Sequence, residues 1–173
     1  MAIVLDGNNL LTTGVLNSMT AQNASGTAVD FTGIPVGVKR ITVVFNGISA
    51  TGTAIIQVQL GSGSLQTSGY SCVSGYGAYS STSGGTISTG FPVTSVAGWT
   101  GIAGNILYGS MFITLLGSNS WTSQSSVAIT GGSYQGIHFG AGGVTLSGAV
   151  DRLRLTTNGA DTFDAGSVNV LYE

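Results

Sequence analysis

Apolar and polar residues alternate most clearly between residues 39 and 60, and we expect the rest of the fold to be organised around this stretch. Every second residue is apolar in Ile41–Phe45 and again in Ile56–Leu60. This period, carried by β-branched and aromatic side chains, is typical of strands with one buried face. The turn-prone pairs Asn46-Gly47 and Thr51-Gly52 separate the two runs. The pattern therefore predicts two antiparallel strands, with one face on a core and the other carrying hydroxyls and amides.

Further short runs suitable for strands follow along the chain, separated by glycine-containing turns. The longest of them, Asn105–Leu116, is apolar on both faces, so we expect it in the centre of a sheet. Pro92 should restrict the strand candidate Thr86–Val93 to a sheet edge, whereas the low-complexity stretch Gly75–Gly85 should form a surface loop. The other candidates are Tyr70–Ser74, Trp121–Ile129, Ser133–Phe139, Leu153–Leu155 and Val168–Tyr172.

These runs amount to roughly eight to ten strands, a number typical of sandwiches and jelly rolls. The 29 glycines oppose long helices, because glycine costs about 1 kcal/mol relative to alanine inside one. We therefore predict an all-β protein with one antiparallel, jelly-roll-like β-sandwich over residues 24–173. Residues 1–23 show no clean period and should form a short extended N-terminal arm. The alternative is an edge strand of the same domain followed by a loop.

Charged residues make up 6% of the 173-residue chain, against roughly 25% in an ordinary soluble domain. None lies between Arg40 and Asp151, so the middle of the chain must present hydroxyls and amides to solvent. The C-terminal charges Arg152, Arg154, Asp161 and Asp164 form a structural cluster that we expect to pair across the Asn158-Gly159 turn. A calcium site at Asp161 and Asp164 is the alternative, but EF-hand spacing is missing, and we predict no metal.

The net charge of −2 removes the usual electrostatic basis for nucleic-acid binding. The longest apolar runs, such as Met111–Leu116, are far short of the ~20 residues of a membrane-spanning helix. We expect no signal peptide, because residues 1–9 have no basic n-region and only a brief apolar run. The single cysteine, Cys72, cannot form an intrachain disulfide and should be a small buried hydrophobe. So neutral a surface lets identical subunits pack together, which favours a homo-oligomer.

No arrangement of residues in the sequence indicates catalysis, and we predict a non-enzyme without a cofactor. Only six acidic residues exist, and none lies in the region most suited to a groove. A Ser-His-Asp triad would have to use His138, the sole histidine, and the G-x-S-x-G elbow is missing. His138 therefore looks like a hydrogen-bonded histidine of a sheet.

Binding through aromatic side chains is the remaining possibility, because rings among neutral hydrogen-bonding groups suit sugars. Tyr70, Tyr108 and Trp121 fall in strand candidates and should be core. Tyr76, Tyr79 and Trp99 fall in glycine-rich loops and are the candidates for contact with a receptor or glycan.

Two segments, Ser25–Ser49 and Leu146–Glu173, resemble a module of tailed-bacteriophage virion proteins that usually forms the C-terminal part of tail-fibre or appendage proteins. The resemblance implies a β-sandwich that forms a homotrimer on the outside of a virion assembled in the host cytoplasm. It implies a role in host attachment, with residues 1–23 docking on other virion proteins. Fibre proteins with this module usually carry a long shaft before it, whereas about two dozen residues precede it here. A capsid decoration (cement) protein is therefore the alternative.

Overall fold

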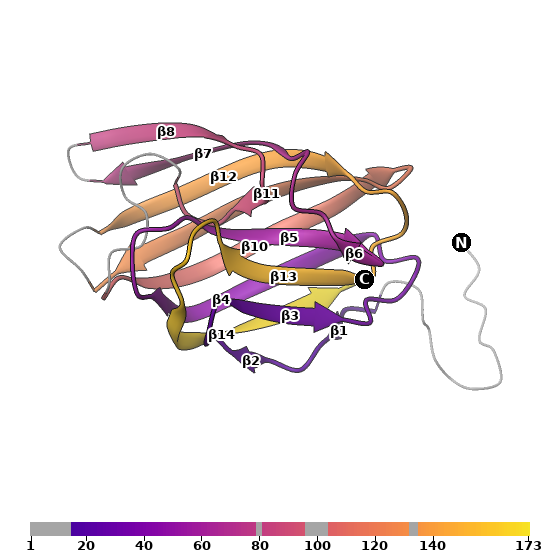
Figure 1. The fold of residues 1–173 in the computed structure, drawn as a ribbon, viewed down its shortest axis with the longest axis horizontal. Helices are drawn as coiled ribbons and strands as arrows, with labels where there is room; N and C mark the ends of the chain where they lie inside the picture. Colours follow the sequence, from indigo (N-terminus) through magenta and orange to yellow (C-terminus); the bar gives the residue numbers. More distant parts are fainter. Residues whose placement is uncertain (1–14, 79–80, 96–103, 132–134) are drawn as a thin grey trace.

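The computed structural model describes residues 15–78, 81–95, 104–131 and 135–173, which form strands and turns without a helix. These residues contain fourteen strands, ten of them five residues or longer. The strands make two antiparallel sheets that pack face to face (Figure 1). The predicted all-β antiparallel sandwich is confirmed, while the jelly-roll-like strand order stays a prediction.

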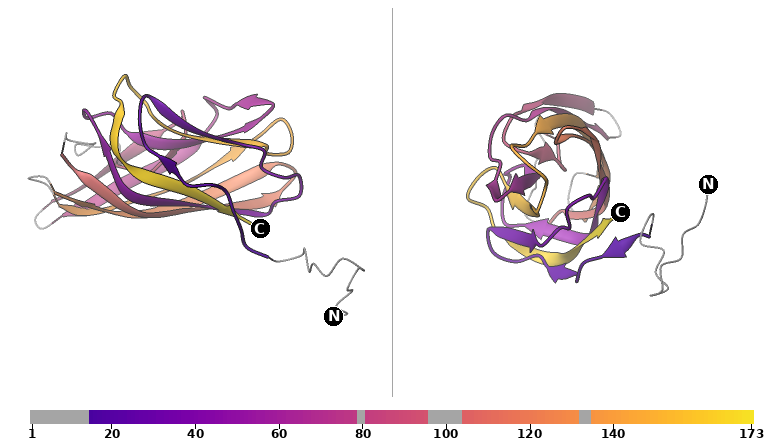
Figure 2. Two further views of the ribbon diagram at one scale, coloured as in Figure 1. Left: turned by 90° about the horizontal axis from the view of Figure 1, so that it is seen from below. Right: turned by 90° about the vertical axis from the view of Figure 1, so that its right-hand side faces the viewer.

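The larger sheet has nine strands and carries the molecule's broad face. In the end-on view of Figure 2 (right), this sheet curls towards the smaller sheet. Across this sheet the strands are β1 (Asn17–Ser18), β14 (Phe163–Tyr172), β4 (Arg40–Ala50), β10 (Ile106–Gly117), β11 (Ser120–Thr130), β12 (Gly136–Thr145), β7 (Ser71–Ala78) and β8 (Ser81–Ile87), with β2 (Gln22–Asn23) also on β14.

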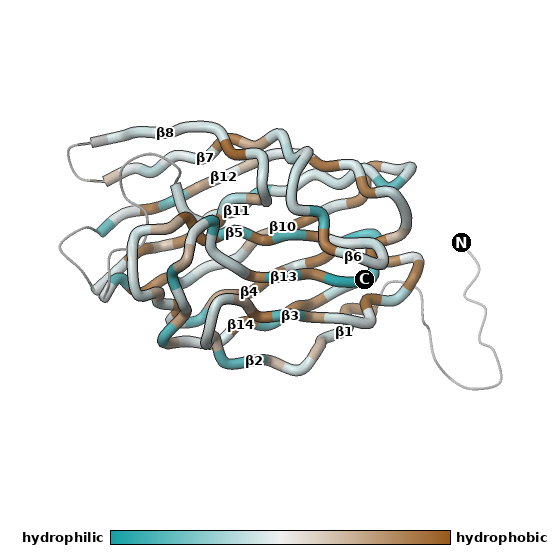
Figure 3. The backbone as a smooth tube through the Cα atoms, viewed as in Figure 1, coloured by the Kyte–Doolittle hydropathy of each residue, from teal (hydrophilic) through white to brown (hydrophobic). Residues whose placement is uncertain are grey.

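The smaller sheet covers the inner face of the larger one. Its strands are, in order, β3 (Ala28–Thr32), β13 (Arg152–Thr157), β5 (Ile56–Ser62) and β6 (Ser64–Leu65), with β9 (Phe91–Pro92) also on β5. Apolar and polar positions alternate along β13 (Figure 3), where Leu153 and Leu155 are completely buried. They face Ile41, Val43 and Met111 in one continuous core between the sheets. Burying each such side chain contributes about 1.5–3 kcal/mol.

The alternation in residues 39–60 marks two strands, as predicted, but they are not a hairpin. β4 lies between β14 and β10 in the large sheet, while β5 pairs with β13 in the small one. The turn-prone Asn46-Gly47 pair is inside β4, where Gly47 takes a φ of +70°. The chain crosses between the sheets after Ala50, and the Ala54 amide donates to Asp161 Oδ2 (2.6 Å) there.

The polar face of β5 is buried too, contrary to the expectation of a solvated face. Gln57 and Gln59 are 2% and 6% exposed. Thr89 bonds one atom of each amide, since its hydroxyl donates to Gln57 Oε1 (2.8 Å) and its carbonyl accepts from Gln59 Nε2 (2.9 Å). A buried amide needs such partners to avoid a desolvation penalty of about 1–3 kcal/mol.

The expected surface loop at Gly75–Gly85 is instead a strand pair. Its described residues belong to β7 and β8, which pair without a break from Cys72↔Ile87 to Ala78↔Ser81. Glycine and serine weaken the sequence signal for a strand, and pairing with β12 supplies what local propensity lacks. Pro92 does lie at an edge, in β9, and Asn105–Leu116 does form a central strand, β10.

The arginines and aspartates of the predicted C-terminal cluster pair differently from the prediction. Arg154 pairs with Asp30 of β3, Arg152 with its neighbour Asp151, and Arg40 with Glu173. The expected pairing of Arg152 or Arg154 with Asp161 or Asp164 is wrong, because β13 lies between β3 and β5, where Arg154 is opposite Asp30. Asp161 accepts from the Ala54 amide, and Asp164 is exposed. Among the described residues, no group of three or more His, Cys, Asp and Glu side chains could hold a metal ion.

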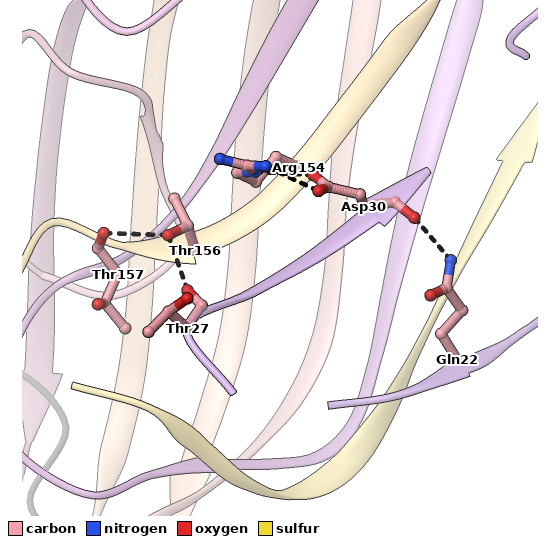
Figure 4. Close-up of polar contacts among 6 residues, drawn as sticks. All are labelled: Gln22, Thr27, Asp30, Arg154, Thr156 and Thr157. Carbon is pink, nitrogen blue, oxygen red and sulfur yellow. Dashed lines mark hydrogen bonds and ion pairs between the residues drawn. The ribbon is translucent and has the colours of Figure 1, made fainter. Parts of the chain in front are cut away.

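The described part of the N-terminal segment lies along the edge strand β14. Asn17 and Ser18 pair with Tyr172 and Leu171, and the Met19 amide donates to the Val170 carbonyl (2.8 Å). Gln22 Nε2 then donates to the carbonyl of Asp30 in β3 (2.8 Å; Figure 4). Residues 17–23 thus connect the edges of both sheets. This arrangement corresponds to the alternative given above, in which the segment forms an edge strand of the same domain.

Candidate interaction surface

The outer face of the large sheet carries an unusual group of exposed apolar side chains, which we call the outer face patch. Nine large hydrophobic residues are exposed in the described part of the chain, and five of them point outward from three of its strands. They are Val73, Tyr108, Phe112, Ile137 and Phe139, each 41–58% exposed. Single exposed apolar residues are ordinary, but a group on one face marks an interaction surface.

A groove of about 550 Å³ lies within this patch, over β12, β7 and β8. Its outward-facing lining includes Val73, Gly75, Phe139 and Ala141. A Cβ atom built on Gly75 would lie 3.1 Å from two ring atoms of Phe139. The ring therefore lies over Gly75, and glycine leaves it room to lie against the sheet with half of its surface exposed.

The patch is electrically neutral. β7, β8, β10, β11 and β12 contain no Asp, Glu, Lys or Arg. Between the apolar groups on β10 and β12, the strand β11 exposes Thr122, Gln124 and Ser126. A surface of hydroxyls, an amide and apolar rings complements a partner that is also uncharged.

A buried polar layer supports this face from inside. The Ser95 amide donates to His138 Nδ1 (2.9 Å), and the Ser125 hydroxyl donates to the Pro92 carbonyl (2.9 Å). Burial lowers the pKa of His138 to about 4, so the ring is neutral at pH 7. It stacks on Tyr76 with ring centroids 5.6 Å apart. His138 is thus a hydrogen-bonded sheet histidine, as predicted.

The structure does not support Tyr76 as an exposed contact. Tyr76 is 4% exposed, because β7 continues through it and its side chain falls on the inner face. Tyr79 and Trp99 lie outside the described residues, so their role as receptor or glycan contacts stays a prediction.

Tyr70 and Trp121 are core, as expected, but Tyr108 is 44% exposed. The Leu60 amide donates to Tyr70 Oη (2.8 Å), and burial raises the pKa of Tyr70 to about 12. Cys72 is buried as predicted, which raises its pKa to about 11.

Sequence reasoning missed Phe112, Ile137 and Phe139 as surface residues. The alternation around His138 was the available signal, since Ile137 and Phe139 fall on one side of a strand and His138 on the other. The alternation of residues does not show which side of a strand is buried. An apolar side is therefore expected to face the core.

No family model matches the chain, and no curated protein or solved structure matches it either.

Proposed function

We propose that this chain is a structural protein of a tailed-bacteriophage virion, a projecting knob of the tail or another appendage that takes part in host attachment. The observation that carries the proposal is the outer face patch: five exposed apolar side chains on strands β7, β10 and β12, which lack charge. Such a face is suited to permanent contact between protein subunits. The resemblance of both ends of the chain to virion modules supports the same reading.

In this proposal the chain forms a homo-oligomer, a trimer by the resemblance. Identical neutral faces meet without like-charge repulsion, and burying Tyr108 and Phe112 would stabilise the contact at about 25 cal/mol per Å² of apolar surface. Both side chains come from β10 and point out of the same face.

The N-terminal segment would connect the knob to another virion protein. Val15 and Leu16 are 46% and 55% exposed at the point where the described chain begins. Residues 17–23 are fixed to β14 and to β3. A load on the segment would therefore pass into both sheets of the sandwich.

Capsid decoration is the second candidate. A groove of about 420 Å³ beside Val15 is lined by Pro35, Val36 and Tyr172, with Val36 85% exposed. The lining also includes Asn17 and Glu173, and a groove of mixed polar and apolar character next to the N-terminal segment would suit a clamp on a neighbouring capsid subunit.

Labelling the protein on purified particles and counting its copies tests both candidates. An appendage knob should be found at the tail or its fibres in on the order of ten copies, set by appendage symmetry. Hundreds of copies over the head would favour decoration instead. Absence of the chain from purified particles would refute both.

A further inference from the structure

Most sheet edges in the described chain are protected against pairing with another protein. β14 is covered by β1 and β2. The edge strand β3 carries Asp30, whose side chain pairs with Arg154 and whose carbonyl accepts from Gln22 (Figure 4). On the opposite side of the small sheet, β6 and β9 are two residues long, and β9 contains a proline. Covering, charge, shortness and proline are the usual means of preventing edge-to-edge association.

The edge strand β8 has none of these protections. It is seven residues long, Ser81–Ile87, with the sequence STSGGTI, and contains neither a charge nor a proline. It pairs with β7 through all seven residues in unbroken register, so no bulge twists it away. Its second edge pairs with no strand in the described part of the chain. β8 therefore presents a row of backbone donors and acceptors suited to a further strand.

We propose that β8 pairs antiparallel with β8 of a second copy of this chain, around a two-fold axis at Gly84. This register uses the whole strand, because Gly84 is its middle residue. It places Thr82 of each copy opposite Thr86 of the other, and both threonines are exposed on the outer face. Threonine pairs across antiparallel strands are favourable.

The chemistry of this edge favours a second copy over a different partner. In a two-fold contact, the same surface of both copies meets. The edge of β8 can meet itself in this way because the strand carries no charge that would repel its copy. The groove over β7 and β8 borders the same edge. Pairing therefore joins the two grooves across one continuous sheet. The contact is independent of any contact through Tyr108 and Phe112. It joins two assemblies of the kind proposed above, so that two trimers become a hexamer and the number of copies is even.

Two double variants test the contact and its register. Thr82→Lys with Thr86→Lys places lysine opposite lysine twice across the seam, and should weaken association about tenfold or more. Thr82→Lys with Thr86→Glu places lysine opposite glutamate twice and should keep the assembly. Thr53→Lys with Thr67→Lys adds the same charge at two exposed threonines away from β8 and is the matched control. The mass in solution is measured by light scattering, with circular dichroism as the check on folding.

The expected result is an even multiple of the 17.3 kDa chain for the wild type, the control and the lysine–glutamate variant, and half that mass for the lysine–lysine variant. An odd-numbered or monomeric wild type would overturn the proposal. So would equal masses for the two β8 variants.

Disulfide trapping decides the question if the charged variants fail to fold. Thr82→Cys with Thr86→Cys puts two cysteine pairs across the seam. Within one chain the two positions are about 13 Å apart along the strand, too far for a disulfide. The double variant should run as a covalent dimer on a non-reducing gel, and Thr82→Cys alone should not. A double variant that stays monomeric under oxidation would contradict the proposed register.

Discussion

Arg154 of β13 holds Asp30 of β3 through two parallel hydrogen bonds, Nε to Oδ1 and Nη2 to Oδ2, both 2.7 Å long (Figure 4). The two residues are directly opposite each other in the strand register. The hydrogen bonds from Arg154 hold the pKa of Asp30 below its usual value. In a chain with so few charges, this pair fixes the register of an edge strand.

Replacing Asp30 by asparagine should lower the free energy of unfolding by about 0.5–1 kcal/mol, because both partners are partly exposed and screened by solvent. Since the folded pKa of Asp30 is lowered, its contribution is present above the usual carboxylate pKa and is lost as the pH falls through the folded value. Urea titrations at pH 7 and pH 3 measure both effects. Asp164→Asn, at an exposed position of β14, is the control and should change little. An equal loss in both variants would argue against a specific role of the pair.

The buried His138 should make the fold sensitive to mild acid. Its folded pKa is about 4, below the usual 6.5, so the unfolded chain binds a proton more readily between these values. Stability should therefore be constant above about pH 6.5 and fall as the pH drops from there towards 4.

Chemical denaturation of the wild type and of His138→Asn between pH 7 and 4 measures this. Asparagine can still accept the Ser95 amide bond but does not titrate. The variant should lose less stability than the wild type over this range, and parallel curves would contradict a role of His138.

Replacing each of two glycines with positive φ by alanine distinguishes the cost of backbone strain from the cost of steric crowding. Gly166 has a φ of +91°, and an added Cβ would lie 2.3 Å from the Gly47 carbonyl oxygen. Gly63 has a φ of +72° and open space around it. Gly63→Ala should cost about 1–2 kcal/mol from conformation alone, whereas Gly166→Ala should cost several kcal/mol more, because two backbones must separate. The midpoints of urea unfolding measure the stability of both variants. Similar losses would show that β4 and β14 can move apart at Gly166 with little cost.

Neighbouring residues of β10 test the assignment of the two sheet faces. Ile113 is completely buried and Phe112 is 41% exposed. Ile113→Ser should lower the free energy of unfolding by about 3 kcal/mol or more, through lost burial and an added polar group in the core. Phe112→Ser should change it by less than about 1 kcal/mol but weaken assembly. Thermal melts give the first comparison and light scattering the second. A Phe112 variant that assembles like the wild type would remove this side chain from the interface.

Local pattern was informative where one face of a strand is buried, as in β4 and β13, because alternation then reports burial directly. The local pattern did not predict which strands pair. β4 and β5 look like a hairpin in the sequence, but they belong to opposite sheets. Only the Gly75–Gly85 stretch, which contains parts of β7 and β8, was mistaken for a loop, since neighbouring strands stabilise these glycine-rich segments. The surface side chains Phe112 and Phe139 were missed because a sequence does not reveal that an apolar face is left uncovered.

Cryo-electron microscopy of intact particles tests the central claim most directly. If the protein is a virion structural component, the sandwich should fit density on the outside of the particle, with Tyr108 and Phe112 of the outer face patch covered by a neighbouring subunit. Particles that contain the chain but leave this face open to solvent, or purified particles that lack the chain, would contradict the account.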